Sequence, residues 1–196
     1  TRRGWHVSTA ASNGERVSHT TLISTSGDCP TGVTEDQFQY ESIGVIHSPF
    51  DSPEEMPIQP VGADAATGTV ELETSYSEGL QDLDGFTHCI LLYHFHAADD
   101  TVSLQVEPFL DDVHRGLFAT RAPQRPNPIG LSVVEIDTVT EHEVTVKGVD
   151  VVDGTPLLDI KPFVPQFDVP EDATETGWID ASRSTVRSTR ADERFL

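Results

Sequence analysis

The sequence predicts an all-β protein, built as either a barrel or a sandwich. Many short strand-like segments follow one another along the 196 residues, and turn signals separate them. Few segments carry the apolar spacing of a helix. The first expected strand is not followed by a Gly-x-Gly-x-x-Gly turn, so the sequence does not predict a doubly wound dinucleotide-binding fold.

The expected elements can be placed in chain order. The first strand ends where Ser48-Pro49 stops it, and a proline-bearing loop leads to the second. The third strand is the most hydrophobic, and Cys89 within it is interpreted as a small core residue. A short helix is expected at residues 77–83. The full set of expected strands covers residues 40–47, 68–73, 88–96, 102–106, 131–136, 143–152 and 157–161.

Three regions divide the chain. Residues 1–38 are rich in Ser, Thr and Gly with little apolar periodicity, so we expect a poorly structured, flexible extension. Residues 39–168 hold the expected strands and form the β domain. Residues 169–196 form a C-terminal extension that is acidic at first and then basic. Its arginines have helical spacing and would form one basic stripe, made of Arg183, Arg187, Arg190 and Arg194.

The chain is strongly acidic, with a formal net charge of −21 and a pI near 4.4. Only two lysines occur, Lys147 and Lys161, and the acids are spread along the chain. This composition is typical of halophilic archaea, so we expect a halophilic source. In molar salt the Debye length falls to about 3 Å, so the net charge does not exclude a nucleic-acid substrate.

Cysteine content and hydropathy limit the cellular context. Cys29 and Cys89 make neither a disulfide framework nor a zinc site. The chain has no apolar run long enough to span a membrane and no signal-peptide pattern. A cytoplasmic protein without a membrane partner is therefore expected.

A rigid loop at residues 118–131 stands out. It contains three prolines within six residues, which force extended backbone and cannot donate to a sheet ladder. Gly130 then permits a bend or a close backbone approach before the next strand. The surrounding residues 113–134 contain no Asp or Glu, and they include Arg115, Arg121 and Arg125. Such a patch is typical of binding to an anionic group, although arginines that pair with nearby acids in a structural loop are an equal alternative.

Residues 118–132, Phe-Ala-Thr-Arg-x-x-x-Arg-Pro-Asn-Pro-Ile-Gly-Leu-Ser, resemble the signature of the TsaA/TrmO family of S-adenosylmethionine-dependent tRNA methyltransferases. Three further segments match in the same order, at residues 43–50, 83–88 and 150–163. The resemblance covers about residues 39–168. It implies an antiparallel β-barrel with short helices and flexible terminal extensions, and a homodimer.

The same resemblance implies the chemistry. The cofactor would be S-adenosylmethionine, and the methyl acceptor would be N6-threonylcarbamoyladenosine beside the tRNA anticodon. The implied cofactor-binding residues are Gln59, Pro60, His96, Arg121, Leu131, Asp153, Gly154, Thr155 and Pro156. The residues expected to orient the acceptor and support catalysis are Arg125, Asn127, Asp159 and Lys161.

Two of these sequence segments also predict local structure. Asp153-Gly154-Thr155-Pro156 is a strong hairpin-turn signal. Asp159 and Lys161 are two residues apart in an expected strand, so they share a face, with Leu158 and Ile160 on the other. An ordinary surface ion pair is the alternative to a functional pair there.

The sequence also leaves other functions open. His88, His94 and His96 have the parity of metal ligands on one strand, with Glu107 or His114 as further ligands, which would suit a metal-dependent β-barrel enzyme. A non-catalytic RNA-binding barrel is another alternative. The basic C-terminal stripe could contact the tRNA backbone, or it could be a solvated tail that pairs with the protein's own acids.

Overall fold

The computed structural model describes residues 38–54, 56–63, 66–99, 101–172 and 174–192. Two compact units divide the chain, residues 1–41 and 42–196, and the described helices and strands lie in the second. The expected N-terminal extension lies outside the described residues except for its last residue. Arg194 of the expected basic stripe lies outside them as well.

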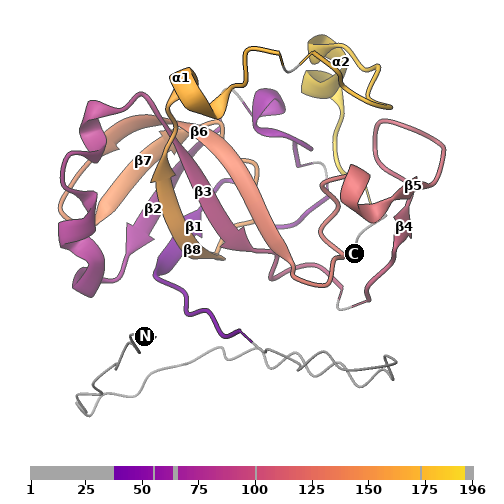
Figure 1. Cartoon of the computed structure of the whole chain (residues 1–196). Coiled ribbons are helices and arrows are strands. Elements are labelled where there is room, and N and C mark those ends of the chain that lie inside the picture. The colour runs from indigo at the N-terminus through magenta and orange to yellow at the C-terminus, as the bar shows by residue number, and fades with distance from the viewer. Residues whose placement is uncertain (1–37, 55, 64–65, 100, 173, 193–196) are drawn as a thin grey trace, which may run out of the picture. The chain divides into compact units, whose positions relative to one another are not determined.

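Six antiparallel strands close into a barrel in the order β1-β2-β7-β6-β3-β8 (Figure 1). The expected antiparallel barrel is therefore confirmed. Its strands are β1 Gly44–His47, β2 Thr67–Leu72, β3 His88–His94, β6 Ile129–Val139, β7 Glu143–Lys147 and β8 Thr155–Pro162.

Shorter elements occupy the connections. A two-stranded sheet forms from β4 (Gln105–Val106) and β5 (Arg115–Gly116). Only the last two residues of the strand expected at 102–106 therefore pair. The helical elements are η1 Pro60–Gly62, η2 Thr74–Leu80, η3 Leu83–Gly85, η4 Leu117–Ala119, α1 Pro165–Asp168 and α2 Arg183–Ser188.

Two positive φ angles explain two of the places where the expected boundaries were wrong. The single helix expected at residues 77–83 is two 3₁₀ segments, because Asp82 lies between them in the left-handed region with a φ of 65°. The strand expected at residues 143–152 ends at Lys147, because Gly148 turns the chain with a φ of 83°.

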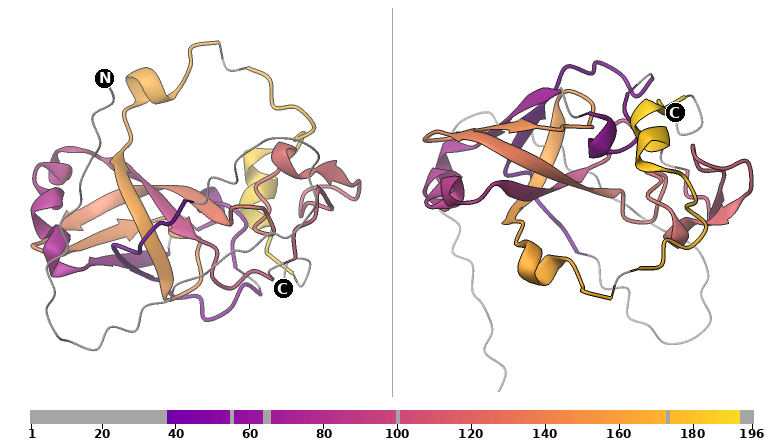
Figure 2. Two further views of the ribbon diagram at one scale, coloured as in Figure 1. Left: turned by 60° about the horizontal axis from the view of Figure 1, so that its bottom comes forward. Right: turned by 90° about the horizontal axis from the view of Figure 1, so that it is seen from above.

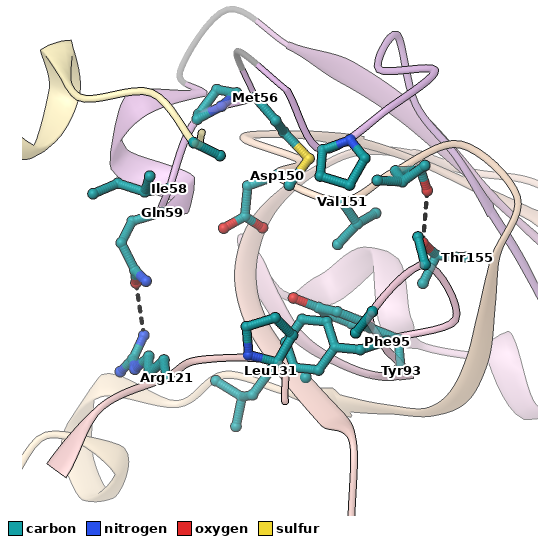
Figure 3. A pocket seen from close by; sticks show the side chains of 18 of the residues that line it. Met56, Ile58, Gln59, Tyr93, Phe95, Arg121, Leu131, Asp150, Val151 and Thr155 are labelled. Atoms are coloured by element: carbon teal, nitrogen blue, oxygen red, sulfur yellow. Dashed lines mark hydrogen bonds between the residues drawn. The ribbon is translucent and has the colours of Figure 1, made fainter. Parts of the chain in front are cut away.

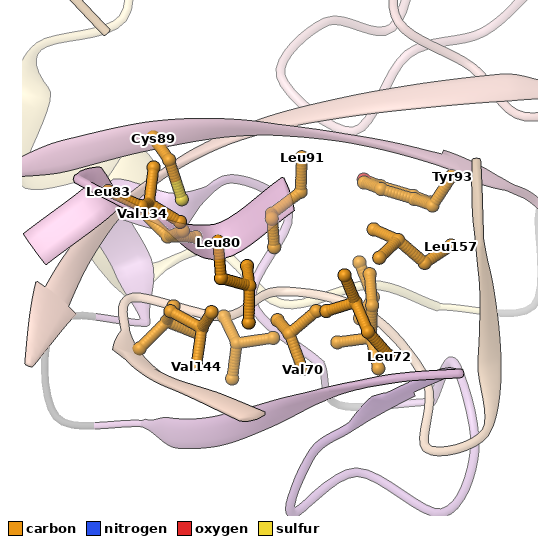
Figure 4. Packing of buried hydrophobic residues seen from close by; sticks show 14 residues of the cluster. Val70, Leu72, Leu80, Leu83, Cys89, Leu91, Tyr93, Val134, Val144 and Leu157 are labelled. Atoms are coloured by element: carbon orange, nitrogen blue, oxygen red, sulfur yellow. The ribbon is translucent and has the colours of Figure 1, made fainter. Parts of the chain in front are cut away.

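Inward-facing side chains of the six barrel strands fill the barrel interior (Figure 4). Along β3, Cys89, Leu91 and Tyr93 point inward and are at most 4% exposed. Burial raises the pKa of the Cys89 thiol to about 12, as expected for an inert core cysteine. Leu80 and Leu83, from η2 and η3, join the same core and cover one end of the barrel.

A β-bulge in β8 decides which of its side chains face the core. Leu92 pairs with Asp159 and Tyr93 with Leu157, so one extra residue lies in β8. Leu157 and Ile160 consequently both reach the interior. Asp159 and Lys161 share one face, as predicted, and the bulge turns this face outward; their carboxylate and ammonium groups lie 2.6 Å apart.

The strand order places β7 and β8 on opposite sides of the six-strand ring. Residues 148–154 must therefore cross the barrel end. Backbone hydrogen bonds fix both ends of this crossing segment, from Gly148 N to Ala66 O and from Gly154 N to Ile46 O. The hairpin predicted at Asp153–Pro156 is wrong, because the strands before and after this turn do not pair with each other. Gly154 does make a turn with a φ of 77°, but the turn leads into β8, which pairs with β1 and β3 and not with β7.

The C-terminal segment packs along η1 and the loop before it (Figure 2). Arg190 forms a β-bridge with Pro57, and Ala191 N donates to Met56 O over 2.8 Å. The helix α2 ends at Ser188, so a single helical stripe that includes Arg190 is not formed. No helix in the described part of the chain is long and apolar enough to cross a bilayer.

Gly130 makes the close approach that the sequence predicted, and it supplies a stability test. A Cβ at this position in β6 would overlap the ring of Tyr93. We expect Gly130→Ala to lower the free energy of unfolding by about 1–3 kcal/mol through overpacking, measured by urea denaturation. Gly116→Ala is the matched control, because open space surrounds Gly116, and its effect should stay within about 0.5 kcal/mol. Equal effects of the two changes would contradict this account.

Candidate functional site

A cavity of about 370 Å³ lies at the barrel end that residues 148–154 cross (Figure 3). Its wall comes from the end of β3 and the residues after it, the start of β6, the crossing segment, and the loops around residues 56–59 and 120–125. Ala191 and Asp192 of the C-terminal segment complete it. The lining is mainly apolar with a few polar groups directed inward, and the volume suits a nucleoside-sized ligand.

Asp150 is a partly buried acid on the wall of this cavity. Ser132 Oγ donates to Asp150 Oδ1 over 2.6 Å, and the Tyr93 hydroxyl lies 3.0 Å from Ser132 Oγ. Burial raises the pKa of the Asp150 carboxyl to about 7, an increase that the Ser132 hydrogen bond and the charge of Arg121 limit. Burial also raises the pKa of Tyr93. Tyr93, Ser132 and Asp150 thus form a connected polar network against the barrel core.

Sequence reasoning missed Asp150 as a site residue. One signal was present, because Asp150 interrupts the apolar run that includes Val149 and Val151, and both of these valines are buried. An acid inside such a run is uncommon unless it has a partner. The partner, Ser132, is 18 residues away in β6, and only the closed barrel brings the two together.

Arg121 and Gln59 meet at the cavity wall. Arg121 Nη1 donates to Gln59 Oε1 over 2.9 Å, although the two residues are 62 positions apart (Figure 3). Both were predicted to bind the cofactor, and the structure brings them together on one wall. The Arg121 side chain remains exposed, so its other donors can reach a ligand.

His96 and Thr155 form a second polar corner. The Thr155 hydroxyl donates to Val152 O over 2.6 Å, and its oxygen lies 3.4 Å from His96 Nδ1. Because the single hydroxyl proton points at Val152, the neutral imidazole would carry its proton on Nδ1 and present Nε2 as an acceptor. Burial and the neighbouring His94 lower the pKa of His96, which favours this neutral form.

The remaining predicted residues divide into two groups. Arg125 and Leu131 line the cavity. Arg125 Nη1 also donates to Ala122 O over 3.0 Å, and this hydrogen bond stabilises the proline-rich loop. The others do not line it: Pro60, Asn127, Asp153, Gly154, Pro156, Asp159 and Lys161. Their functional roles stay predictions.

Of the three arginines in the acid-free stretch, Arg115 has a different role. Its Nε donates to Asp111 over 2.8 Å, and its guanidinium lies 5.4 Å from the centre of the Trp178 ring. Trp178 Nε1 in turn donates to Ala119 O over 2.8 Å. The structural-loop alternative therefore describes Arg115, while Arg121 and Arg125 reach the cavity.

The alternative metal site gains no support. Among the described residues, no three His, Cys, Asp or Glu side chains gather as a ligand set. His88 and His94 share the outer face of β3, whereas His96 lies beyond the strand end at the cavity.

Comparisons with known proteins show similarity across this barrel. A sequence profile of the tRNA-methyltransferase O N-terminal domain matches residues 45–169. A probable S-adenosyl-L-methionine-binding protein of Pyrococcus abyssi is 48% identical over 157 residues, which cover 80% of this chain and 84% of that protein. The tRNA (adenine(37)-N6)-methyltransferase of Escherichia coli is 36% identical, covering 65% of this chain and 58% of that protein.

A solved structure of TrmO from Pseudomonas aeruginosa superposes with a TM-score of 0.61 at 38% identity, covering 74% of this chain and 63% of that one. The chain thus spans less than two thirds of this structure and of the Escherichia protein. These relatives do not come from the expected halophilic source, which stays a prediction.

The raised pKa of Asp150 has a consequence for stability. The pKa of the Asp150 carboxyl is about 7 in the folded protein and about 4 in the unfolded chain, so the folded protein binds this proton more tightly. The stability that this proton binding contributes is therefore lost as pH rises from about 4 to 7. We expect Asp150→Asn to gain stability relative to the wild type over this window, by at most about 1.4 kcal/mol for each pH unit. Urea unfolding at pH 5, 6, 7 and 8 measures the difference. A constant difference across these pH values would contradict the raised pKa of Asp150.

Proposed function

Because the chain belongs to the tRNA-methyltransferase O family, we propose that it methylates N6 of threonylcarbamoyladenosine beside the tRNA anticodon, with S-adenosylmethionine as methyl donor. The Escherichia relative, by its name, methylates N6 of adenine 37 in tRNA, and the Pyrococcus relative is named as a probable S-adenosyl-L-methionine-binding protein. The cavity at the crossed barrel end is the observation that carries the proposal, because the residues of the family signature form part of its wall.

The cavity residues fit the proposed cofactor. S-adenosylmethionine supplies the methyl group on a sulfonium centre, and the rest of the chemistry is positioning. Arg121 and Gln59 offer charged and amide groups to the polar end of the ligand, and Phe95 and Leu131 offer apolar surface to its base. His96 and Thr155 line the opposite part of the wall. Pro60, Asp153, Gly154 and Pro156 flank lining residues in sequence, so we propose a supporting role for them.

The acceptor side is proposed to use Arg125, Asn127, Asp159 and Lys161. Of these, Arg125 lines the cavity. Asn127 is exposed on the same proline-rich loop. Asp159 and Lys161, on the outer face of β8, would meet the threonyl carboxylate or the RNA backbone only where the substrate extends past the cavity.

We propose that the enzyme works as a homodimer in the cytoplasm, with tRNA as its partner. Apolar side chains are exposed around β4 and β5, namely Leu104 at 67%, Val113 at 53% and Phe118 at 78%. Surfaces of this kind are typical of protein–protein contacts. We also propose that the basic residues of the C-terminal segment contact the tRNA.

The function is tested by calorimetric titration with S-adenosylmethionine, followed by methylation of tRNA with and without the threonylcarbamoyl group. We expect binding, and methylation only of the modified tRNA. Binding without turnover would instead favour a non-catalytic RNA-binding barrel, and methylation of unmodified tRNA would refute the proposed acceptor.

Arg121→Gln should raise the dissociation constant for S-adenosylmethionine about tenfold, which corresponds to about 1.4 kcal/mol, because a charge-assisted contact is lost. Lys147→Gln is the control, since Lys147 pairs with Asp137 on the barrel surface and should leave the affinity unchanged. Equal affinities of the two variants would remove Arg121 from the cofactor site.

We further propose that the acidic surface is adapted to concentrated salt. Screening of the mutual repulsion among 33 acids should raise the melting temperature by about 5 °C or more between 0.1 M and 2 M KCl. The rise should shrink in a variant that combines Glu78→Gln and Asp84→Asn, two exposed positions. A melting temperature independent of salt would contradict the adaptation.

A further inference from the structure

Asp150 is a partly buried ionisable group on the cavity wall that the cofactor and acceptor contacts above leave without a role. The crossing segment carries it over the barrel end, between the buried Val149 and Val151. Figure 3 shows its carboxylate directed into the cavity, facing the wall that Arg121 and Gln59 form. Removing a carboxylate from water costs desolvation energy. If Asp150 served only to stabilise the fold, its hydrogen bonds would have to offset this cost.

The hydrogen bonds to Asp150 hold its carboxylate in one orientation, but they leave much of its negative charge uncompensated. Ser132, which is only 2% exposed, donates from its side chain to Oδ1, and the backbone amide of Asp150 itself also contributes a hydrogen bond. The Tyr93 hydroxyl hydrogen-bonds to the Ser132 hydroxyl. The Tyr93 ring in turn packs in a T-shaped arrangement against the Phe95 ring, with 5.4 Å between the ring centroids. Tyr93 and Ser132 lie on barrel strands, and Asp150 lies on the crossing segment, whose two ends are fixed by backbone hydrogen bonds. The network therefore positions one carboxylate oxygen rigidly while the carboxylate still faces the cavity.

We propose that Asp150 is the general base that takes the proton from the acceptor nitrogen during methyl transfer. This inference rests on the proposed function, because it requires an acceptor that carries an N–H proton. Methylation forms a nitrogen–carbon bond, breaks the carbon–sulfur bond with its electron pair left on sulfur, and releases the N–H proton. The Asp150 carboxylate receives that proton, so both atoms and charge balance.

The charge balance explains why a partly buried carboxylate suits this step. Before transfer, the negative Asp150 would face a positively charged methyl donor, and each charge stabilises the other in a site of low polarity. Transfer removes the positive charge, so the proton affinity of Asp150 rises at the moment when a proton is released. A base with this behaviour works near neutral pH, where proton transfer by a positioned side chain typically contributes 10²–10⁴-fold to the rate.

The ionisable groups around Asp150 come from several elements. Tyr93 on β3 stays neutral, and Arg121 on the loop after η4 is the cation that acts on Asp150. Arg125, His96 and Asp192 line other parts of the cavity. Because Asp150 must be ionised to accept a proton, the rate should fall as pH drops through its pKa, which the positively charged donor would lower below the value of about 7 found without it.

The first test is the pH profile of single-turnover methylation of threonylcarbamoyl-modified tRNA, from pH 5 to pH 9. The wild type should lose rate on the acidic side. Asp150→Asn should be slower by about 100-fold or more and lack this acidic limb. Ser132→Ala should shift the limb to higher pH, because the lost hydrogen bond had stabilised the carboxylate. Asp84→Asn is the control, because it removes an exposed acid that does not line the cavity, and its pH profile should match that of the wild type.

The second test does not use activity. At pH 7, binding of S-adenosylmethionine should release about half a proton more than binding of S-adenosylhomocysteine, because only the former carries the sulfonium charge that ionises Asp150. Calorimetry in buffers of different ionisation enthalpy measures this difference, and Asp150→Asn should abolish it.

The outcomes separate the two proposals. A wild type that does not methylate the modified tRNA refutes the proposed function, whatever the proton release. A wild type that does methylate it, with an Asp150→Asn variant that retains the rate within about threefold and the same pH profile, overturns the role of Asp150 alone. Equal proton release by the wild type and Asp150→Asn overturns that role as well.

Discussion

The site depends on one topological constraint, which is that β7 and β8 lie on opposite sides of a closed six-strand ring. The seven residues between them must cross the barrel end, and they pass over a core that β1, β3 and β6 have already filled. Val149 and Val151 turn into this core, and Asp150 between them turns toward Ser132 and the cavity. The placement of the acid follows from barrel closure, because an open sheet would not force the chain across that end.

The cavity wall opposite Asp150 is held by contacts between segments far apart in sequence. The small cluster of Val106, Leu117 and Ala122 supports the loop that carries Arg121. On the outer side, Trp178 holds the carbonyl of Ala119, and Ala191 holds that of Met56. The C-terminal segment thus packs against both loops that form the wall, and the Arg121–Gln59 hydrogen bond joins them directly. Preorganisation of this kind suits a site that mainly positions its ligands.

The electrostatic design contrasts with the overall charge. A net charge of −21 would repel RNA at low ionic strength, yet Arg121 and Arg125 line the cavity. The few cations elsewhere on the barrel have their own acidic neighbours, as Lys147 has Asp137 and Lys161 has Asp159. Local attraction at the cavity and general acidity elsewhere are compatible where salt screens the long-range repulsion.

The amino-acid sequence alone indicated the all-β class, most strand positions, the proline-rich loop and a constrained position at Gly130, where a bend and a close approach were both open. These depend on neighbouring residues, such as the fixed φ of proline and the alternation of inward side chains, so a local pattern carries them. It also named Gln59, His96, Arg121, Arg125, Leu131 and Thr155, which the fold gathers around one cavity. Tertiary structure alone decided the bulge that turns Asp159 and Lys161 outward, the crossing that replaces a hairpin before Thr155, and the pairing of Asp150 with Ser132. These features depend on which strands become neighbours when the barrel closes, and that choice is made by contacts between residues distant in sequence.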